Sequence, residues 1–305
     1  MAATGGSRRA KGLSDQGTGL YEAGLRFWQK SYAGDYLGLV LLLAAYLAVQ
    51  LVAEPFHKMF RLDNARIQYP HAEMETVPAL WLFIYGGAVP LATLIVWTVT
   101  FRPSIHKAHV TILGLATTIL LTLIITDMLK NGVGRPRPDL IARCKPADST
   151  PTDILVTWKV CTETQHNLLH DGWRSWPSGH SSFAWSGLGY LALFLASQTH
   201  ALRARASLAL VLLCLLPLAG ASFVAISRLE DYRHQVEDVI CGSLLGMGIA
   251  YFNWRRYYPS LLSESCDEPH APRGSGKLGA NGGFQRVRDE EEGRFSISDE
   301  SGARR

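Results

Sequence analysis

Charge is scarce in this sequence. Only 18% of its 305 residues are Asp, Glu, Lys or Arg, while 48% are hydrophobic, and the formal net charge is +4. The basic residues are scattered and form no stripe with interleaved aromatic residues, which argues against nucleic-acid binding. No internal repeat of a solenoid is present. Residues 1–30 also lack the apolar core and small-residue cleavage site of a removable signal peptide, so the first apolar run is expected to act as an uncleaved signal anchor.

Long apolar runs fill the middle of the chain instead. A helix needs about 20 predominantly apolar residues to cross the roughly 30 Å hydrocarbon core of a bilayer. Several segments approach that length, and they predict an all-α polytopic membrane protein with six transmembrane helices. The expected spans are 36–53, 77–100, 110–129, 181–197, 207–226 and 239–254, of which 181–197 is interrupted by Ser and Gly.

Polar tails flank these spans, so we expect three parts. Residues 1–35 form a polar N-terminal tail, residues 36–254 form the six-span domain, and residues 255–305 form a C-terminal tail. The C-terminal tail carries Gly, Ser and clustered charge with few apolar groups. Such a composition cannot bury enough surface to offset the entropy of the chain, so this tail is expected to be disordered.

The basic residues also predict the orientation in the membrane. With an even number of spans both termini lie on one side, and Lys and Arg are enriched beside the termini and in the second and fourth loops. The positive-inside rule therefore places both termini in the cytoplasm. The first, third and fifth loops then face the lumen of an endomembrane compartment (vacuole, endoplasmic reticulum or Golgi) or the exterior of the plasma membrane.

The third loop, residues 130–180, contains Cys144 and Cys161, the only two cysteines on the expected oxidising side. Disulfides persist in that environment, so a bond between these two residues is one expectation. Two free thiols in a mobile loop are the alternative.

Three polar clusters lie at span ends on that same face. The first contains Lys130, Arg135 and Arg137. Cations at span ends often extend toward the lipid headgroups, and this is the plain interpretation. Positive charge is disfavoured on the non-cytoplasmic side, however, so its concentration there indicates an anion that needs to be bound.

The second cluster is Pro177-Ser178-Gly179-His180, which has the residue types of a helix start. The free N–H groups and the dipole of a helix N-terminus favour phosphate binding. An ordinary N-cap is the alternative. His180 in the same turn can give or take a proton near neutral pH, which favours a catalytic interpretation.

The third cluster is the stretch SRLEDYRHQVED, residues 227–238. A helix that already begins near Tyr232 would place His234 and Asp238 on one face, so that the carboxylate orients the imidazole and leaves its other nitrogen as base or nucleophile. Arg228 offers a planar fork for an oxyanion. A helix-capping salt bridge is the alternative. The remaining charges are interpreted as serving solvent, headgroups or helix capping: Glu230, Asp231, Arg233 and Glu237.

In chain order, the clusters contain the motifs Lys130-x6-Arg137-Pro138, Pro177-Ser178-Gly179-His180 and Ser227-Arg228-x5-His234-x3-Asp238. Together they resemble the three-part signature of the type 2 phosphatidic acid phosphatase (lipid phosphate phosphatase) superfamily. The resemblance extends from about residue 36 to 254 and is closest to fungal and plant enzymes that act on phosphatidate and diacylglycerol pyrophosphate. It implies a haloperoxidase-like helical core and hydrolysis through a phosphohistidine without magnesium.

The resemblance also implies a role for each signature residue. His234 would be the nucleophile, Asp238 would orient it, and His180 would protonate the leaving alcohol. The phosphate oxygens would be held by Lys130, Arg137, Ser178, Gly179 and Arg228. Arg135 falls outside the signature spacing and is left out of the expected site.

No metal or other cofactor is expected. His166 and His170 have the i,i+4 spacing of zinc ligands, but the accompanying Glu of an HExxH motif is absent. The expected partner is a phospholipid substrate in the bilayer, and the sequence indicates no oligomeric state. The expected substrates are phosphatidate, lysophosphatidate and, by the same resemblance, diacylglycerol pyrophosphate.

Two other functions stay open. One is the same chemistry on a sphingoid-base phosphate or on a soluble phosphate ester, as in the glucose-6-phosphatase group. The other is a non-enzymatic scaffold or transporter, which would be expected to have lost some of the nucleophile, acid or phosphate-binding residues. Every one of those residues is present in this sequence.

Overall fold

A computed structural model describes residue 28, residues 32–204 and residues 206–272. The predicted tails therefore lie largely outside the described residues. The chain divides into two units, Ser31–His270 and the two chain ends Met1–Lys30 with Ala271–Arg305. All the helices named below belong to Ser31–His270.

The unit Ser31–His270 is helical, as the sequence predicts, and its described residues contain no strand beyond two isolated β-bridges. Each expected span coincides with a helical segment. Four of these segments are long and apolar enough to cross a membrane: α2 (Ala33–Val52), the run Ala79–Phe101, α5 (Ile105–Val133) and α9 (Leu208–Glu230). The run Ala79–Phe101 consists of α3 (Ala79–Phe83), a π-helical turn (Ile84–Ala88) and α4 (Val89–Phe101). The other two helices are α8 (Gly179–Gln198) and α10 (Val236–Tyr257).

Helix α5 is longer than the predicted span 110–129. It begins after the N-cap Ser104, whose hydroxyl accepts from the Lys107 N–H at 3.2 Å, and it ends before the C-cap Gly134, which adopts a left-handed φ of 58°. The residues of these first and last turns are largely polar, so hydropathy alone did not predict that they are helical. As a consequence, Lys130 lies in the last turn of the helix and not in the loop that follows it.

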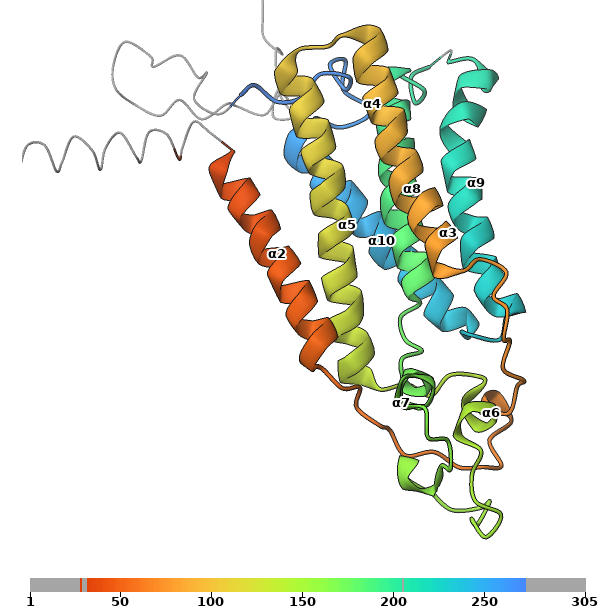
Figure 1. The fold of residues 1–305 in the computed structure, drawn as a ribbon. Helices are drawn as coiled ribbons and strands as arrows, with labels where there is room; N and C mark the ends of the chain where they lie inside the picture. The colour runs from red at the N-terminus through yellow and green to blue at the C-terminus, as the bar shows by residue number, and fades with distance from the viewer. Residues whose placement is uncertain (1–27, 29–31, 205, 273–305) are drawn as a thin grey trace, which may run out of the picture. The chain divides into compact units, whose positions relative to one another are not determined.

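Helix α8 lies at the centre of the bundle and packs against α5, α9 and α10 (Figure 1). Most of its residues are buried, including the serines and glycines that interrupt the predicted span. Small residues allow close helix contacts: a Cβ at Gly187 would overlap the Gly86 carbonyl, and a Cβ at Gly246 of α10 would overlap the Ser182 carbonyl. A helix enclosed by other helices needs no lipid-facing apolar surface, which accounts for the modest hydropathy of α8.

The segment after α10 differs from the prediction that disorder begins at residue 255. Helix α10 continues to Tyr257, and Tyr258 and Cys266 are fully buried. The Tyr258 hydroxyl lies 2.6 Å from the Thr111 hydroxyl, and the buried Lys107 donates to Glu268 at 3.0 Å. These few apolar and paired groups are enough to hold residues 258–270 against the bundle despite their polar composition.

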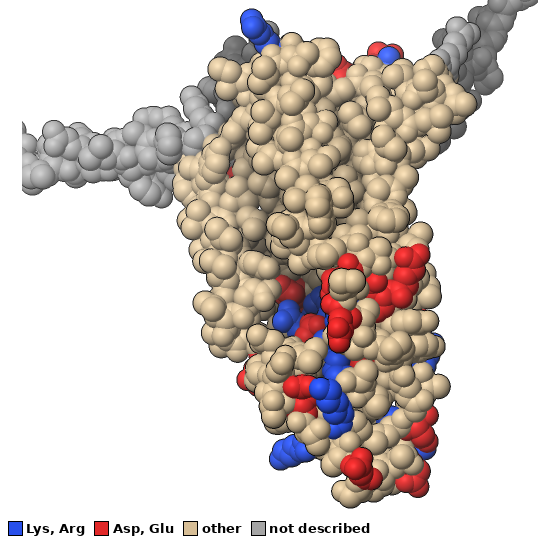
Figure 2. All heavy atoms as spheres, turned by 45° about the vertical axis from the view of Figure 1, so that its right-hand side comes forward, with Lys and Arg blue, Asp and Glu red and all other residues tan. Residues whose placement is uncertain are grey.

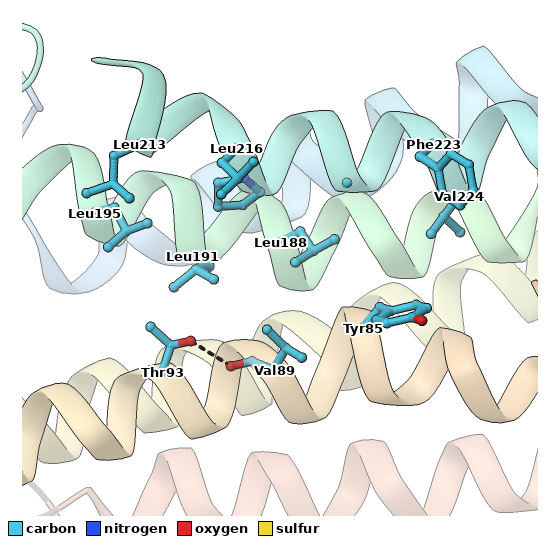
Figure 3. Close-up of a pocket in the computed structure, with 12 residues that line it drawn as sticks. Tyr85, Val89, Thr93, Leu188, Leu191, Leu195, Leu213, Leu216, Phe223 and Val224 are labelled. Atoms are coloured by element: carbon cyan, nitrogen blue, oxygen red, sulfur yellow. Dashed lines mark hydrogen bonds between the residues drawn. The ribbon is translucent and has the colours of Figure 1, made fainter. Parts of the chain in front are cut away.

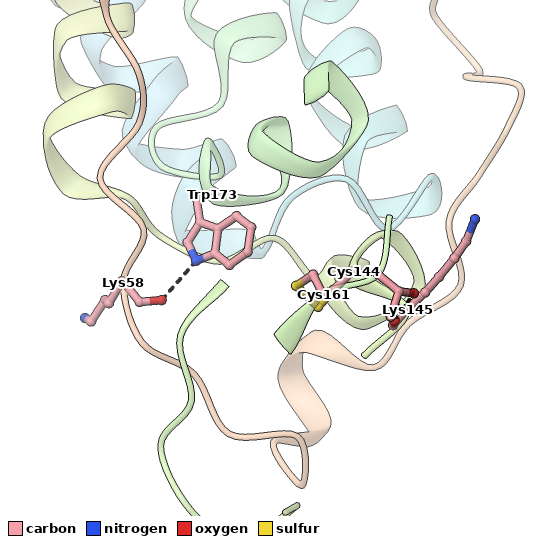
Figure 4. Close-up of a disulfide and its surroundings, with 6 residues drawn as sticks. Lys58, Cys144, Lys145, Cys161 and Trp173 are labelled. Atoms are coloured by element: carbon pink, nitrogen blue, oxygen red, sulfur yellow. Dashed lines mark hydrogen bonds between the residues drawn. A yellow bond between two sulfur atoms is a disulfide. The ribbon is translucent and has the colours of Figure 1, made fainter. Parts of the chain in front are cut away.

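The third loop folds into short helices beyond the ends of α5 and α8 (Figure 1). They include α6 (Leu140–Cys144) and α7 (His166–His170). Cys144 and Cys161 form a disulfide here, and the buried Trp173 donates from its indole N–H to the Lys58 carbonyl at 2.9 Å (Figure 4). This loop is therefore a packed region that ties the connection after α2 to the mouth of the helical bundle.

Candidate active site

The three polar clusters of the sequence meet at one end of the bundle. The first is at the C-terminus of α5, the second at the N-terminus of α8, and the third at the turn between α9 and α10. The Ser178 N–H donates to the Asp238 carbonyl at 2.9 Å and so joins the second cluster to the third. On the face shown in Figure 2, most acidic and basic side chains gather toward this end, where they line a hollow below the uncharged helical surface.

The turn that carries His234 differs from the predicted helix start near Tyr232. Helix α10 begins at Val236 with Gln235 as its N-cap, so His234 precedes the helix. Tyr232 adopts a left-handed φ of 51°, and this turn brings the His234 N–H back to the Arg228 carbonyl at 3.3 Å. His234 and Asp238 are still neighbours, but the turn and the helix cap bring them together rather than a shared helix face.

The Asp238 carboxylate is fully buried and is held by several donors. Its Oδ2 accepts from the Gln235 N–H at 3.0 Å and from the Ser175 hydroxyl at 2.6 Å. Its Oδ1 accepts from Arg135 Nη1 at 2.8 Å, and Arg135 Nη2 also donates to the Gln235 side chain. Asp238 therefore caps helix α10, as the helix-capping alternative predicts. Arg135, which the signature spacing leaves out, and Ser175 are positioning residues that the sequence analysis missed.

His234 is buried beside this carboxylate, with 5% of the residue exposed. Its Nδ1 has no hydrogen-bond partner among the described residues, and the nearest carboxylate oxygen, Asp238 Oδ2, is 3.8 Å away. Burial lowers the pKa of His234 to about 3, and the cations Arg137 and Lys130 act in the same direction, while Asp238 opposes them. The lowered pKa favours a neutral imidazole at ordinary pH, with Nδ1 toward Asp238 and the lone pair of a ring nitrogen available for chemistry.

Ser178 is the N-cap of α8. Its hydroxyl accepts from the Ser181 N–H at 3.4 Å and from the Ser181 hydroxyl at 2.9 Å. Part of the hydrogen-bonding capacity of Ser178 therefore caps the helix, as the ordinary N-cap alternative predicts. Gly179 lies against Lys130, because a Cβ at this position would be 3.3 Å from Lys130 Cε. His180 follows in the first turn, and its Nε2 lies 3.1 Å from the Val77 carbonyl oxygen.

The three cations of the signature are buried, and protein acceptors orient each of them. Lys130 Nζ donates to the Arg174 carbonyl at 2.8 Å, Arg137 Nη2 to Asp171 Oδ1 at 2.9 Å, and Arg228 Nη2 to Asp231 Oδ2 at 2.6 Å. Burying a charge is costly unless it is paired, so these contacts keep the cations in place without substrate.

These cations act as one electrostatic group. Burial alone would raise the pKa of Asp171, yet Arg137 and Arg143 hold it well below its usual range. Lys130, Arg137 and Arg228 also lie close enough to His180 to interact with its charge, as does His234. Charged residues from all three motifs therefore lie close enough together to interact, an arrangement that suits a bound oxyanion.

Two residues interpreted as serving solvent, headgroups or capping are in fact buried. Asp231 accepts from Arg228 and from the Thr76 N–H at 3.0 Å, and Arg233 donates to the Ala72 carbonyl at 2.8 Å. Both residues bind the connection between α2 and α3 to the site. No sequence spacing indicates this, because the partners are more than 150 residues apart.

The histidine pair His166 and His170 packs beside His57. Their rings are 4.0 Å apart, and His170 Nδ1 is 2.5 Å from His57 Nε2. Within the described residues, no group of three or more His, Cys, Asp or Glu side chains is arranged to hold a metal ion.

A buried histidine beside a carboxylate, a second histidine and a set of fixed cations at one end of a helical bundle define a class of membrane phosphohydrolase. Residues 111–260 match the family model described as the PAP2 superfamily. The chain belongs to this superfamily, which is the family that the three motifs indicate.

Curated relatives are similar in sequence over most of the chain. The probable diacylglycerol pyrophosphate phosphatase 1 of Schizosaccharomyces pombe is 37% identical over 242 residues, which are 79% of this chain and 86% of the relative. Diacylglycerol pyrophosphate phosphatase 1 of Saccharomyces cerevisiae is 40% identical over 68% of this chain and 73% of its own length. Lipid phosphate phosphatase 2 of Arabidopsis thaliana is 33% identical over 78% of this chain and 81% of its own length.

Proposed function

We propose that this protein is an integral membrane phosphatase that hydrolyses lipid phosphates. The substrates are phosphate monoesters such as phosphatidate and lysophosphatidate, together with diacylglycerol pyrophosphate. The observation that carries the proposal is the neutral, buried His234, which lies beside Asp238 and among the cations Lys130, Arg137 and Arg228. The names of the relatives support the same chemistry and the lipid class of the substrate.

In the proposed first step, His234 Nε2 attacks the phosphorus atom while Asp238 stabilises the ring charge that develops. The bond between phosphorus and the ester oxygen breaks, its electron pair stays on that oxygen, and the His180 imidazolium supplies the proton. The cations and the N–H groups at the start of α8 stabilise the phosphoryl oxygens. In the second step water attacks the phosphohistidine and gives a proton to His180, and the phosphorus–nitrogen bond breaks to release phosphate and neutral His234.

An apolar cavity supports a lipid substrate over a soluble ester. It measures about 500 Å³ and lies between α4, α8 and α9. Figure 3 shows Leu188, Leu191, Phe223 and Val224 among the side chains that line it. Val224 precedes Arg228 by four residues, about one turn of α9. Apolar surface of this kind suits an acyl chain whose headgroup lies at the cationic end of the helices.

For the topology, we propose that α8 and α10 cross the membrane with the four apolar segments. Residues 36–254 then form the phosphatase domain between two cytoplasmic ends, and the active site faces the lumen or the exterior. The burial of α8 supports this, because an enclosed helix can span the bilayer with few apolar residues. The basic residues near the chain ends and in the second and fourth loops support the orientation.

The decisive experiment replaces His234 with Asn. We expect phosphatidate hydrolysis in isolated membranes to fall by at least about 10³-fold, because removal of a covalent nucleophile leaves only binding and electrostatic effects. The matched control is His166→Asn, which changes an exposed histidine outside the site and should retain wild-type activity. Wild-type activity of the His234 variant at equal expression would refute the proposal.

A substrate panel then tests the lipid class. Phosphatidate, lysophosphatidate, diacylglycerol pyrophosphate, sphingosine phosphate and glucose 6-phosphate are compared with and without EDTA. We expect the glycerolipids to be preferred and EDTA to have no effect. Preference for sphingosine phosphate or glucose 6-phosphate would keep the chemistry and replace the proposed substrate.

A further inference from the structure

The connection between α2 and α3 reaches the site at Glu75, a residue that lies outside all three motifs. Its Oε2 accepts from Arg228 Nη1 at 2.9 Å, and its Oε1 lies 3.2 Å from Arg233 Nη2. The same carboxylate is 3.7 Å from His180 Nε2. Within the described residues, no other carboxylate lies within ion-pair distance of His180.

The neighbouring Val77 fixes the tautomer of His180. Its carbonyl oxygen lies 3.1 Å from His180 Nε2, and a carbonyl oxygen can only accept a hydrogen bond. Nε2 therefore carries the proton of the neutral ring. Nδ1 is then the nitrogen that gains a proton in the imidazolium and can pass it to the leaving oxygen.

The charges around His180 make this imidazolium difficult to form. The cations Arg228, Lys130 and Arg137 lie close enough to interact with its charge. Positive neighbours disfavour a second positive charge, and burial disfavours it further. A carboxylate at 3.7 Å is the feature of the described structure that favours the protonated ring.

We propose that Glu75 is a positioning residue for the proton donor: with the Val77 carbonyl it orients His180 and supports its imidazolium form, as Asp238 does for His234. This inference rests on the proposed function of the site. Each histidine of the reaction then has its own carboxylate: Glu75 precedes all three motifs in the chain, and Asp238 ends the third.

The proton transfer gives the inference a specific consequence. When phosphatidate is cleaved, the electron pair of the phosphorus–oxygen bond goes to an alkoxide, which is strongly basic and needs the proton from Nδ1. When p-nitrophenyl phosphate is cleaved, the leaving phenolate is weakly basic and departs without help. Loss of Glu75 should therefore slow the first reaction much more than the second.

The experiment measures kcat/KM of Glu75→Gln for both substrates in detergent micelles, because kcat/KM reports the steps up to phosphoryl transfer. Gln still accepts a hydrogen bond from Arg228 but has no charge. We expect a loss of about 10-fold to 100-fold with phosphatidate, because a positioning residue supports only part of the roughly 10²-fold to 10⁴-fold that general acid catalysis contributes, and a change under about threefold with p-nitrophenyl phosphate. The matched control is Glu73→Gln, an exposed residue of the same connection, which should leave both values unchanged.

Two outcomes would overturn the inference. Equal losses with both substrates would make Glu75 only a structural brace for Arg228 and Arg233. A lower KM or faster turnover with both would mean that its carboxylate competes with phosphate for Arg228. If the wild-type enzyme cleaves p-nitrophenyl phosphate but not phosphatidate, the lipid substrate is refuted, and Glu75 is judged on the alkyl phosphate that the enzyme does hydrolyse.

Discussion

At the scale of single residues, chemistry depends on which partner each histidine meets. His234 lies beside Asp238, as the spacing of the motif predicts, but the partners that hold Asp238 come from elsewhere in the chain. Arg135 and Ser175 both donate to its carboxylate. Such contacts lower the freedom of the carboxylate, and they place its charge where the ring of His234 needs it.

The burial of His234 has a consequence for stability against pH. Its pKa is about 3 in the folded protein, compared with 6.5 for a free histidine. Between these values the unfolded chain binds more protons, so the stability contribution of the neutral ring is present above pH 6.5 and is lost as the pH falls toward 3. At pH 5 the difference is on the order of 2 kcal/mol.

We therefore expect the thermal midpoint of the purified protein to fall between pH 7 and pH 5, and to fall less in His234→Gln. His57 and His170 also have lowered pKa values and keep part of the slope in both proteins. Thermal unfolding in detergent measures this, with His166→Gln as the control. An identical slope in wild type and His234→Gln would contradict the prediction.

At the scale of elements, close packing of α8 against its neighbours sets the geometry of the site. The histidine His180 and the N-cap Ser178 are at one end of this helix, so its position determines theirs. Gly246 of α10 allows the two helices to approach, because a Cβ there would overlap the backbone of Ser182. Gly248 of the same helix faces open space instead, with nothing within 4 Å of an added Cβ.

These two glycines give opposite predictions for the same substitution. In a free helix Gly→Ala is favourable by up to about 1 kcal/mol, but overpacking costs about 1–3 kcal/mol. We expect Gly246→Ala to lower the thermal midpoint and the activity, and Gly248→Ala to leave both unchanged or slightly raised. Thermal unfolding and phosphatidate hydrolysis are the measurements, and equal tolerance of both variants would refute this packing.

At the scale of the whole folded unit, the loops complete the site as much as the helices do. The third loop supplies Arg137, Asp171 and Ser175, and the connection after α2 supplies Glu75. The disulfide between Cys144 and Cys161 closes a segment of 17 residues within the third loop. It therefore limits the freedom of the region that carries Arg137, which we propose binds phosphate.

Removal of this disulfide should destabilise the protein. A cross-link over a loop of about 15 residues contributes roughly 3 kcal/mol in the chain-entropy view, so we expect the double variant Cys144→Ser with Cys161→Ser to have a clearly lower thermal midpoint. Cys241→Ser, which changes a free cysteine of α10, is the matched control. Mass spectrometry of non-reduced peptides checks the bond itself, and two free thiols in wild type would refute it.

The sequence by itself determined the helical class, the positions of the long helical segments and the three motifs. Each of these depends on local properties: apolar length for a span, Pro, Ser and Gly at a helix start, and short spacings such as that from His234 to Asp238. The helix ends were less predictable, because polar caps such as Ser104 extend helices beyond their apolar part.

The tertiary structure alone decided which distant residues share the site. Glu75 and Arg228 are 153 residues apart, and Arg135 and Asp238 are 103 apart. Their contacts depend on how the connections fold over the ends of α5, α8 and α9, and no local pattern encodes that. The packing of Tyr258 and Cys266 against the bundle could not be predicted from the sequence for the same reason. It depends on partners on α5 and α8 and not on the composition of the tail.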